Sequence, residues 1–223
     1  MTVATQPRSS LYRPRRGRVE LVDVPELSFL VVPGHGAPEG FDFAAAVQAL
    51  YAVSWGAHFL ARKAFGEASP VMPLEALWWV EGDDQRGLVE DVARGGATMA
   101  DTDRGAWRWE AMMAQGDPVD AVVVAEAVAQ ARGKGLPGLD RLDFRTWEEG
   151  RCAQLLHVGS YAEEGPSLVR LHTVIAQAGL RPRGHHHEIY LGDPRRSAPQ
   201  RLRTILRQPV EPVEQVGPAE PVR

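Results

Sequence analysis

Apolar residues recur along the first half of the chain with two different spacings, and each spacing predicts a type of element. Residues 43–65 are Ala-rich with apolar positions at helical spacing, between Asp42, a plausible N-cap, and Gly66, a plausible C-cap. Three segments are rich in Val, Leu, Trp or Met, which favours strands: 19–32 with a bend at Pro25, 71–81 and 106–115. Asp117 and Pro118 then resemble a helix start, which predicts a helix over 119–132.

The second half of the chain passes through the same order of elements. A helix is predicted over 167–178, opened by Pro166 and closed by Gly179. Four segments are predicted as strands: 142–147, 151–159, 185–191 and 201–210. MPLEALWW around Glu75 aligns with HHHEIYLG around Glu188, and MMAQGDPV aligns with ILRQPVEPV. The shared order predicts an α+β fold: a duplicated strand–helix–strand–strand module with pseudo-two-fold symmetry, a curved antiparallel sheet and a central ligand cleft.

The segments outside this repeat are polar and set the expected domain limits. Residues 1–17 are basic and predicted to be a flexible tail, and residues 211–223 are predicted to be a disordered tail. The domain then spans 18–210, with repeat one at about 18–118 and repeat two at about 140–210. Residues 82–103 are acidic and weakly periodic, which predicts a mobile connection.

Composition excludes several classes of protein. The 223 residues carry a net charge of −4, which gives no reason to expect nucleic-acid binding. Cys152 is the only cysteine, so neither an intrachain disulfide nor a multi-cysteine zinc site can form. Neither a signal-peptide pattern nor an apolar run of about 20 residues is seen, so we expect a cytoplasmic protein with no membrane partner.

Two glutamates stand in apolar strand segments, where glutamate is disfavoured. If the halves face each other across a cleft, Glu75 and Glu188 occupy equivalent points on opposite walls. Period-two alternation then places Trp79 beside Glu75, and His186 and Tyr190 beside Glu188. The alternative is that both glutamates are ordinary strand-surface residues.

Further aromatic residues divide between core and cleft. Trp107 and Trp109 share one strand face and suit either place equally. Tyr51 and Trp55 are four residues apart on the first helix, so they either pack on the sheet or line the cleft. His157 is a candidate ligand contact, although a hydrogen-bonded strand histidine is the commoner case.

The run His185, His186, His187 suggests a metal, but adjacent strand side chains alternate between faces, so at most two could share one ion. No acidic or cysteine cluster completes a tetrahedral set. We therefore expect no metal and no cofactor.

With these residues in view, the chain resembles the GyrI-like small-molecule-binding family from Leu11 to Val210. The segments that carry the resemblance are ALYAVSWGAHF, VMPLEALWWVE, WRWEAMMAQGDPV, EEGRCAQLLHVGSY, HHEIYLGDPRR and LRTILRQPV. The resemblance implies a duplicated βαββ fold with a ligand cleft. In drug-sensing members an acidic residue at the place of Glu188 receives flat cationic compounds. Some stand-alone members hydrolyse cyclopropane-bearing, DNA-alkylating compounds, and another relative inhibits DNA gyrase.

Three functions are compatible with these features. The first is binding of bulky, flat, hydrophobic or cationic small molecules, with hydrolysis of cyclopropane-bearing compounds as an extension. In that reaction Glu188 or Glu75 activates water, and Tyr161 or Tyr190 orients it or donates to the developing oxyanion. The second is an interaction protein directed at gyrase, and the third is a sequestering protein without catalysis. No helix-turn-helix precedes the domain, so a transcription regulator is not expected.

Overall fold

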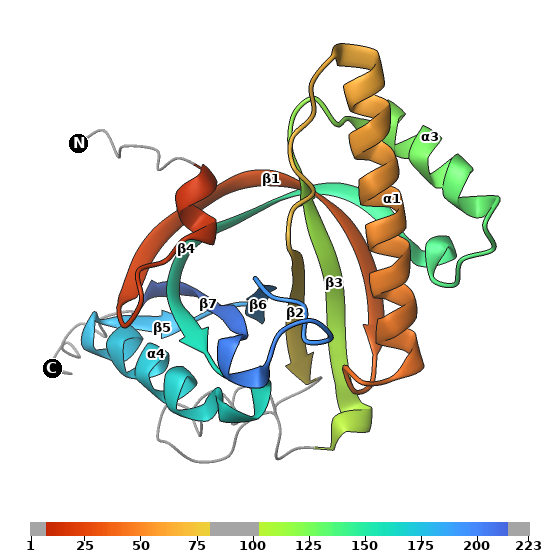
Figure 1. Ribbon diagram of the computed structural model, residues 1–223. Coiled ribbons are helices and arrows are strands. Elements are labelled where there is room, and N and C mark those ends of the chain that lie inside the picture. The colour runs from red at the N-terminus through yellow and green to blue at the C-terminus, as the bar shows by residue number, and fades with distance from the viewer. Residues whose placement is uncertain (1–7, 81–102, 214–223) are drawn as a thin grey trace, which may run out of the picture.

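The computed structural model describes residues 8–80 and 103–213, which form a curved antiparallel sheet with three α-helices packed around it (Figure 1). The strands are β1 (Val19–His35), β2 (Leu74–Val80), β3 (Trp107–Gln115), β4 (Asp143–Val158), β5 (Leu180–Pro182), β6 (His186–Tyr190) and β7 (Arg203–Pro212). The α-helices are α1 (Phe41–Phe65), α3 (Ala121–Arg132) and α4 (Gly165–Gln177). The short 3-10 turns are η1 (Arg8–Tyr12), η3 (Arg104–Ala106), η4 (Leu139–Arg141), η5 (Tyr161–Glu163) and η6 (Pro199–Arg201).

The sheet closes on itself as a ring. Its strand order is β4-β1-β3-β2-β6-β7, β4 also pairs with β7, and the short β5 pairs with the outer part of β7. The order β1-α1-β2-β3 in the first half recurs as β4-α4-β6-β7 in the second. The ring is joined where equivalent strands of the two halves meet, β1 with β4 and β2 with β6. The predicted α+β duplication is confirmed.

The long strands differ from the prediction. The sequence pattern suggested a bend at Pro25 and two separate strands in 142–159, but β1 and β4 are continuous strands of 17 and 16 residues. β1 and β4 pair with each other on both sides of Gly150, which belongs to β4, lies opposite Val24 of β1 and has a φ of 70°. A glycine accepts this left-handed conformation without steric cost, so the strand changes direction while its pairing continues.

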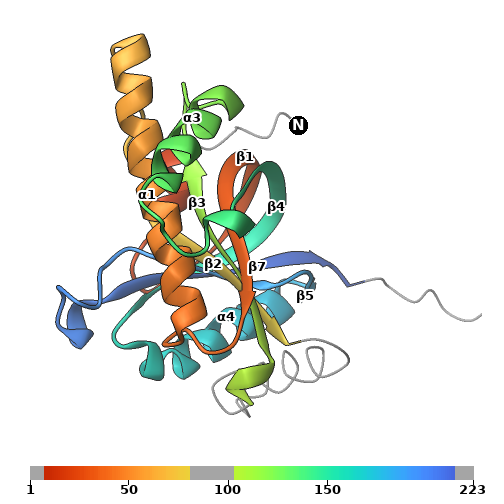
Figure 2. The same ribbon diagram turned by 90° about the vertical axis from the view of Figure 1, so that its right-hand side faces the viewer.

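The helices cover the outer surface of the ring at separate places (Figures 1 and 2). α1 packs on β1, β3 and Trp78 of β2 and also contacts α3, while α4 packs on β4 and β7. α1 is long and apolar enough to cross a membrane by composition, but its buried face forms part of the core with Trp78, Trp109 and Met113. α3 starts later than predicted, because Asp120 rather than Asp117 accepts hydrogen bonds from the first helical backbone N–H groups.

The start of the described chain enters the ring. Residues 8–12 form η1, in which Leu11 is 1% exposed, so the prediction of a flexible tail over residues 1–17 does not hold for this turn. Residues 211 and 212, predicted as part of a C-terminal tail, belong to β7. The predicted mobile connection lies outside the described residues, except for residue 103.

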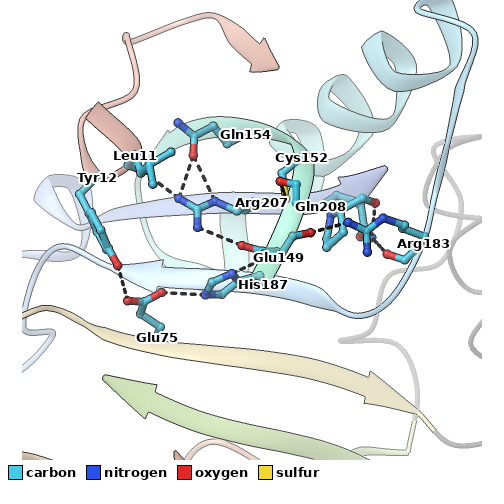
Figure 3. Close-up of polar contacts among 12 residues, drawn as sticks. Leu11, Tyr12, Glu75, Glu149, Cys152, Gln154, Arg183, His187, Arg207 and Gln208 are labelled. Atoms are coloured by element: carbon cyan, nitrogen blue, oxygen red, sulfur yellow. Dashed lines mark hydrogen bonds and ion pairs between the residues drawn. The ribbon is translucent and has the colours of Figure 1, made fainter. Parts of the chain in front are cut away.

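A charged hydrogen-bond network fills the interior of the ring (Figure 3). Arg207 of β7 donates to Glu149 of β4 at 3.1 Å, and to the side chain of Gln154 at 3.2 and 3.0 Å. The same guanidinium donates to the backbone oxygen of Leu11 at 2.9 Å, which ties η1 to the ring. Arg207 is 1% exposed, so its charge depends on these partners rather than on water.

His187 connects the two carboxylates of this network. Its Nδ1 lies 2.9 Å from Glu149 Oε1 and its Nε2 lies 3.0 Å from Glu75 Oε2. The hydroxyl of Tyr12 donates to the other oxygen of Glu75 at 2.9 Å. With both carboxylates ionised, one guanidinium and one imidazolium balance their formal charge inside the ring.

The network changes the pKa of its buried groups. Burial alone would raise the pKa of Glu149, but the adjacent His187 and Arg207 outweigh it and lower the pKa to about 2. Burial alone would lower the pKa of His187, but the carboxylates of Glu149 and Glu75 outweigh it and raise the pKa to about 9. His187 is therefore protonated at neutral pH, donates from Nδ1 to Glu149 and forms an ion pair with Glu75 through Nε2.

Replacing Arg207 with Met should lower the free energy of unfolding by roughly 3–5 kcal/mol, because it leaves a buried carboxylate short of its partner. Chemical denaturation measures this change. The matched control is Arg181→Met, which removes an exposed pair to Glu211 (N–O distance 2.8 Å) and should cost at most about 1 kcal/mol. Equal losses in the two variants would show that the network does not stabilise the ring.

Stability should depend on pH through His187. Its folded-state pKa is raised from 6.5 to about 9, so its contribution is complete below pH 6.5 and is lost as the pH rises through about 9. The Tm difference between the wild type and His187→Gln should therefore be largest below pH 6.5 and shrink towards pH 9. Thermal unfolding of both proteins across this range is the measurement, and a constant difference would contradict the assignment.

Candidate functional site

The two glutamates singled out in the sequence lie on opposite faces of the sheet. β2 and β6 pair so that Glu75 lies opposite Ile189 and Ala76 lies opposite Glu188. Cross-strand neighbours share a face, so Glu75 points into the ring and Glu188 points to its outer surface. The expectation that they face each other across one cleft is wrong, because a shift of one residue turns a strand side chain to the other face.

Glu75 has no contact with the outer surface. It is 1% exposed, and its carboxylate oxygens contact Tyr12 and His187. Figure 3 shows it at the edge of the interior network, beneath η1. Its geometry is that of a structural carboxylate in the closed ring.

Glu188 lies on an outer strip of the sheet that we call the Glu188 face. This face consists of Trp78 of β2, His186, Glu188 and Tyr190 of β6, Tyr161 of η5, and Glu164, which precedes α4. Its side chain is 18% exposed, and its Oε1 lies 3.6 Å from Nε2 of His186. The Trp78 indole donates to the Tyr190 hydroxyl at 2.9 Å. The Tyr161 and Tyr190 rings meet edge to face, with centroids 5.8 Å apart. A partly exposed carboxylate is thus set among aromatic rings.

Glu164 is the residue of this face that the sequence did not indicate. It immediately precedes α4 and is 6% exposed, yet its side chain makes no capping hydrogen bond to the helix. Its neighbour Glu163 forms the capping box of the preceding turn η5 with Ser160. The only available signal was an acidic pair before Pro166, and that signal does not tell which of the two glutamates is buried.

Burial and neighbouring carboxylates control protonation at this face. Burial, followed by the charge of Glu188, raises the pKa of Glu164 well above its ordinary value, so Glu164 holds a proton at neutral pH. Burial and Glu188 likewise raise the pKa of Tyr161 to about 12 and raise that of Tyr190. The face therefore combines a carboxylate at Glu188 with three groups that keep their protons.

Several buried polar atoms on the same face have no hydrogen-bond partner. Among the described residues these are Glu164 Oε1, His172 Nδ1, both ring nitrogens of His186, and Thr204 Oγ1, while Glu75 Oε2, Gln154 Nε2, His187 Nε2 and Trp109 Nε1 are further such atoms in the interior and the core. Thr204 pairs with Tyr190 across β7 and β6, and the charge of His186 acts on His172 of α4. Burial lowers the pKa of His172 to about 4, so its ring is neutral. Such groups are rare in folded proteins and often mark a place where water or a ligand binds.

The histidine run alternates as predicted. His187 points into the ring, His186 points to the Glu188 face, and the ring of His185 stacks on Trp79 with centroids 4.2 Å apart. No group of three potential metal-binding side chains occurs within residues 8–80 and 103–213.

The remaining predicted residues lie away from Glu188. Trp107 and Trp109 are buried in the core beneath α1, at 7% and 0% exposure. Trp79 packs on the opposite side of the sheet from Trp78. His157 is buried and contacts Ser167 Oγ at 2.9 Å and the Ser160 backbone oxygen at 3.1 Å, so it fixes the turn that leads to α4.

Tyr51 and Trp55 line a groove of about 550 Å³ that runs along α1 beside α3. Trp55 is 47% exposed and stacks on Phe59, which excludes the helix-to-sheet packing considered from sequence. Burial and the charge of Asp193, which follows β6, raise the pKa of Tyr51, so this ring lies towards the loop after β6. The structure does not bring Trp55 to the Glu188 face.

Comparison with known proteins identifies relatives over nearly the whole chain. The model of the GyrI-like small molecule binding domain matches residues 105–211. An uncharacterised conserved protein from Listeria innocua is 34% identical with a TM-score of 0.78, covering 92% of this chain and 97% of its own. A hydrolase from the same organism is 33% identical with a TM-score of 0.74, covering 92% and 96%.

A more distant structure shares the fold alone. The C-terminal domain of EcmrR has a TM-score of 0.50 and 11% identity, covering 88% of this chain and 98% of that domain. No curated protein matches the sequence.

Proposed function

The chain belongs to the GyrI-like small-molecule-binding family, and we propose that it binds bulky, flat, hydrophobic or cationic compounds against the Glu188 face. One observation carries this proposal: a partly exposed carboxylate lies with Tyr161, which is 41% exposed, and with Tyr190, whose hydroxyl is held by the buried Trp78, beside buried polar atoms without partners. Aromatic rings offer area for stacking and a negative π-face for a cation. A carboxylate fixes the position of that cation.

The charge of this face supports the preference for cations. Among the described residues, Glu188 has only His186 as an ion-pair partner, and the two atoms are 3.6 Å apart. Asp193, whose charge acts on Tyr161, is itself paired with Arg195 at an N–O distance of 3.1 Å. A flat cation at this face would therefore be attracted mainly by Glu188.

Glu75 does not take part in the proposed site. Its carboxylate is enclosed by the ring, accepts a hydrogen bond from Tyr12 and forms an ion pair with His187. Of the two candidate bases considered from sequence, the proposal therefore assigns ligand contact to Glu188 alone.

Replacing Glu188 with Gln should reduce the affinity for 5-methylphenanthridinium, a flat permanent cation, by at least about tenfold, or about 1.4 kcal/mol. The affinity for uncharged phenanthridine should change little, because the substitution keeps the shape and removes the charge. Quenching of tryptophan fluorescence measures both affinities. The matched control is Glu126→Gln on the exposed face of α3, which should bind both compounds as the wild type does. Unchanged cation affinity in Glu188→Gln would refute the proposed site.

Hydrolysis of cyclopropane-bearing electrophiles is a second candidate function, favoured by the 33% identity to a chain described as a hydrolase. In this reaction Glu188 accepts a proton from water as the water oxygen bonds to a ring carbon. The strained carbon–carbon bond breaks, and its electron pair moves to a conjugated carbonyl oxygen, which is then protonated. Tyr161 and Tyr190 both keep their hydroxyl protons at neutral pH, which supports the proposal that one of them donates to that oxygen.

Incubation with a cyclopropane-bearing alkylating compound, followed by mass spectrometry, tests this second function. The wild type should add the mass of one water to the compound, and Glu188→Gln should slow this at least about a hundredfold, the usual contribution of a general base. The Glu126→Gln variant is again the control. An intact compound that binds the wild type would leave a sequestering protein as the function.

The gyrase-directed alternative predicts a different result. A protein of that kind would retain gyrase in a pull-down, and it would do so equally well after Glu188→Gln. Retention of gyrase without binding of either phenanthridine compound would favour it over the small-molecule site.

A further inference from the structure

Two carboxyl groups from different elements meet at the Glu188 face. Glu188 comes from β6, and Glu164 comes from the residue before α4. Glu164 is 6% exposed, Thr204 is the hydroxyl that acts on its carboxyl, and its Oε1 has no hydrogen-bond partner. Neither glutamate pairs with a described lysine or arginine. Two carboxylates close together in a poorly solvated site do not both ionise, and one of them keeps a proton.

We propose that Glu164 is the second acidic residue of the ligand site, and that a cation bound beside Glu188 releases the Glu164 proton to solvent. The inference rests on the proposed function, since it requires the ligand to occupy the Glu188 face.

The groups that surround Glu164 support this assignment. From β6 it faces Glu188, with Tyr190 and His186 beside it, and Tyr161 faces it from η5. His172 lies on α4 itself and is neutral, because burial and His186 lower its pKa to about 4. The groups close to Glu164 are therefore acidic or neutral, except for His186. The imidazole of His186 already contacts the carboxylate of Glu188. A ligand cation would be the strongest positive charge at the face.

The protonation state of Glu164 in the ligand-free protein determines whether cation affinity rises or falls with pH. Burial and the charge of Glu188 raise the pKa of Glu164, so its carboxyl is protonated at neutral pH without ligand. A cation favours the ionised form and lowers this pKa, so the proton leaves as the cation binds. Cation affinity then rises with pH, up to about tenfold per pH unit between the bound-state and free-state pKa values.

This arrangement lets one site accept two kinds of flat ligand. With a cation, the pair carries two negative charges. With a neutral ligand, Glu164 keeps its proton and offers an O–H donor from a buried position, for example to a carbonyl oxygen. A site with Glu188 as its one acidic residue would favour cations. A site in which Glu164 were always ionised would carry a second negative charge and would reject neutral compounds.

Isothermal titration calorimetry at pH 7 tests the inference. The proton count comes from repeating the titration in phosphate and in Tris, which differ in their enthalpy of ionisation. The wild type should release about one proton on binding 5-methylphenanthridinium and none on binding phenanthridine. Glu164→Gln should release none with either compound, and its cation affinity should not change between pH 6 and pH 8. The control Glu163→Gln changes the adjacent exposed glutamate and should behave as the wild type in proton release.

The outcomes separate this inference from the proposed function. Cation binding at Glu188 without proton release, or equal release from Glu164→Gln, would overturn the role of Glu164 and leave the proposed function standing. Failure of both compounds to bind would overturn the proposed function and the inference with it.

A second measurement needs no ligand. In the ¹³C carboxyl NMR spectrum, the resonance that Glu164→Gln removes should titrate well above pH 7. A resonance that titrates near 4.5, the ordinary value for glutamate, would overturn the inference.

Discussion

The ion pair between Arg207 and Glu149 holds the two ends of the ring together from the inside. It joins the strands β7 and β4, whose pairing closes the sheet, and its 3.1 Å contact is enclosed by the protein. Arg207 also binds the backbone of Leu11, so the same side chain anchors η1. A buried pair of this kind adds little stability over an apolar core, but loss of one partner is costly. The interior thus requires the whole network, including His187 as a cation.

Strand alternation separates this structural chemistry from the proposed ligand chemistry. Along β6, His187 belongs to the interior network, while His186 and Glu188 on either side of it belong to the outer face. Three consecutive residues therefore hold the fold and offer a binding surface at once. This explains why HHEIY is so dense in ionisable and aromatic side chains.

The outer face differs from the interior in how its charges are satisfied. Inside the ring, Glu149 and Glu75 lie within 3.1 Å of cationic side chains, although Glu75 Oε2, His187 Nε2 and Gln154 Nε2 make no hydrogen bond. Neither Glu188 nor Glu164 pairs with a described lysine or arginine, so only the interior balances its charges within the protein. The Glu188 face keeps unpaired polar atoms, protonated carboxyl and phenol groups, and partly exposed rings, which suits it to bind a molecule from outside.

The sequence by itself determined the elements and their duplication, because periodicity and helix caps act over a few residues. α1 with its Gly66 cap and the strand containing Glu188 followed from local patterns. The sequence also showed that Glu188 is unusual, because glutamate is disfavoured in an apolar strand segment. It did not show that Glu75 lies on the other face, because that depends on which residue of β2 pairs with which residue of β6. Nor did it show that Leu11 enters the ring, or that Glu164 rather than Glu163 is buried. Strand register, ring closure and burial join residues far apart in the chain, and only the tertiary structure decides them.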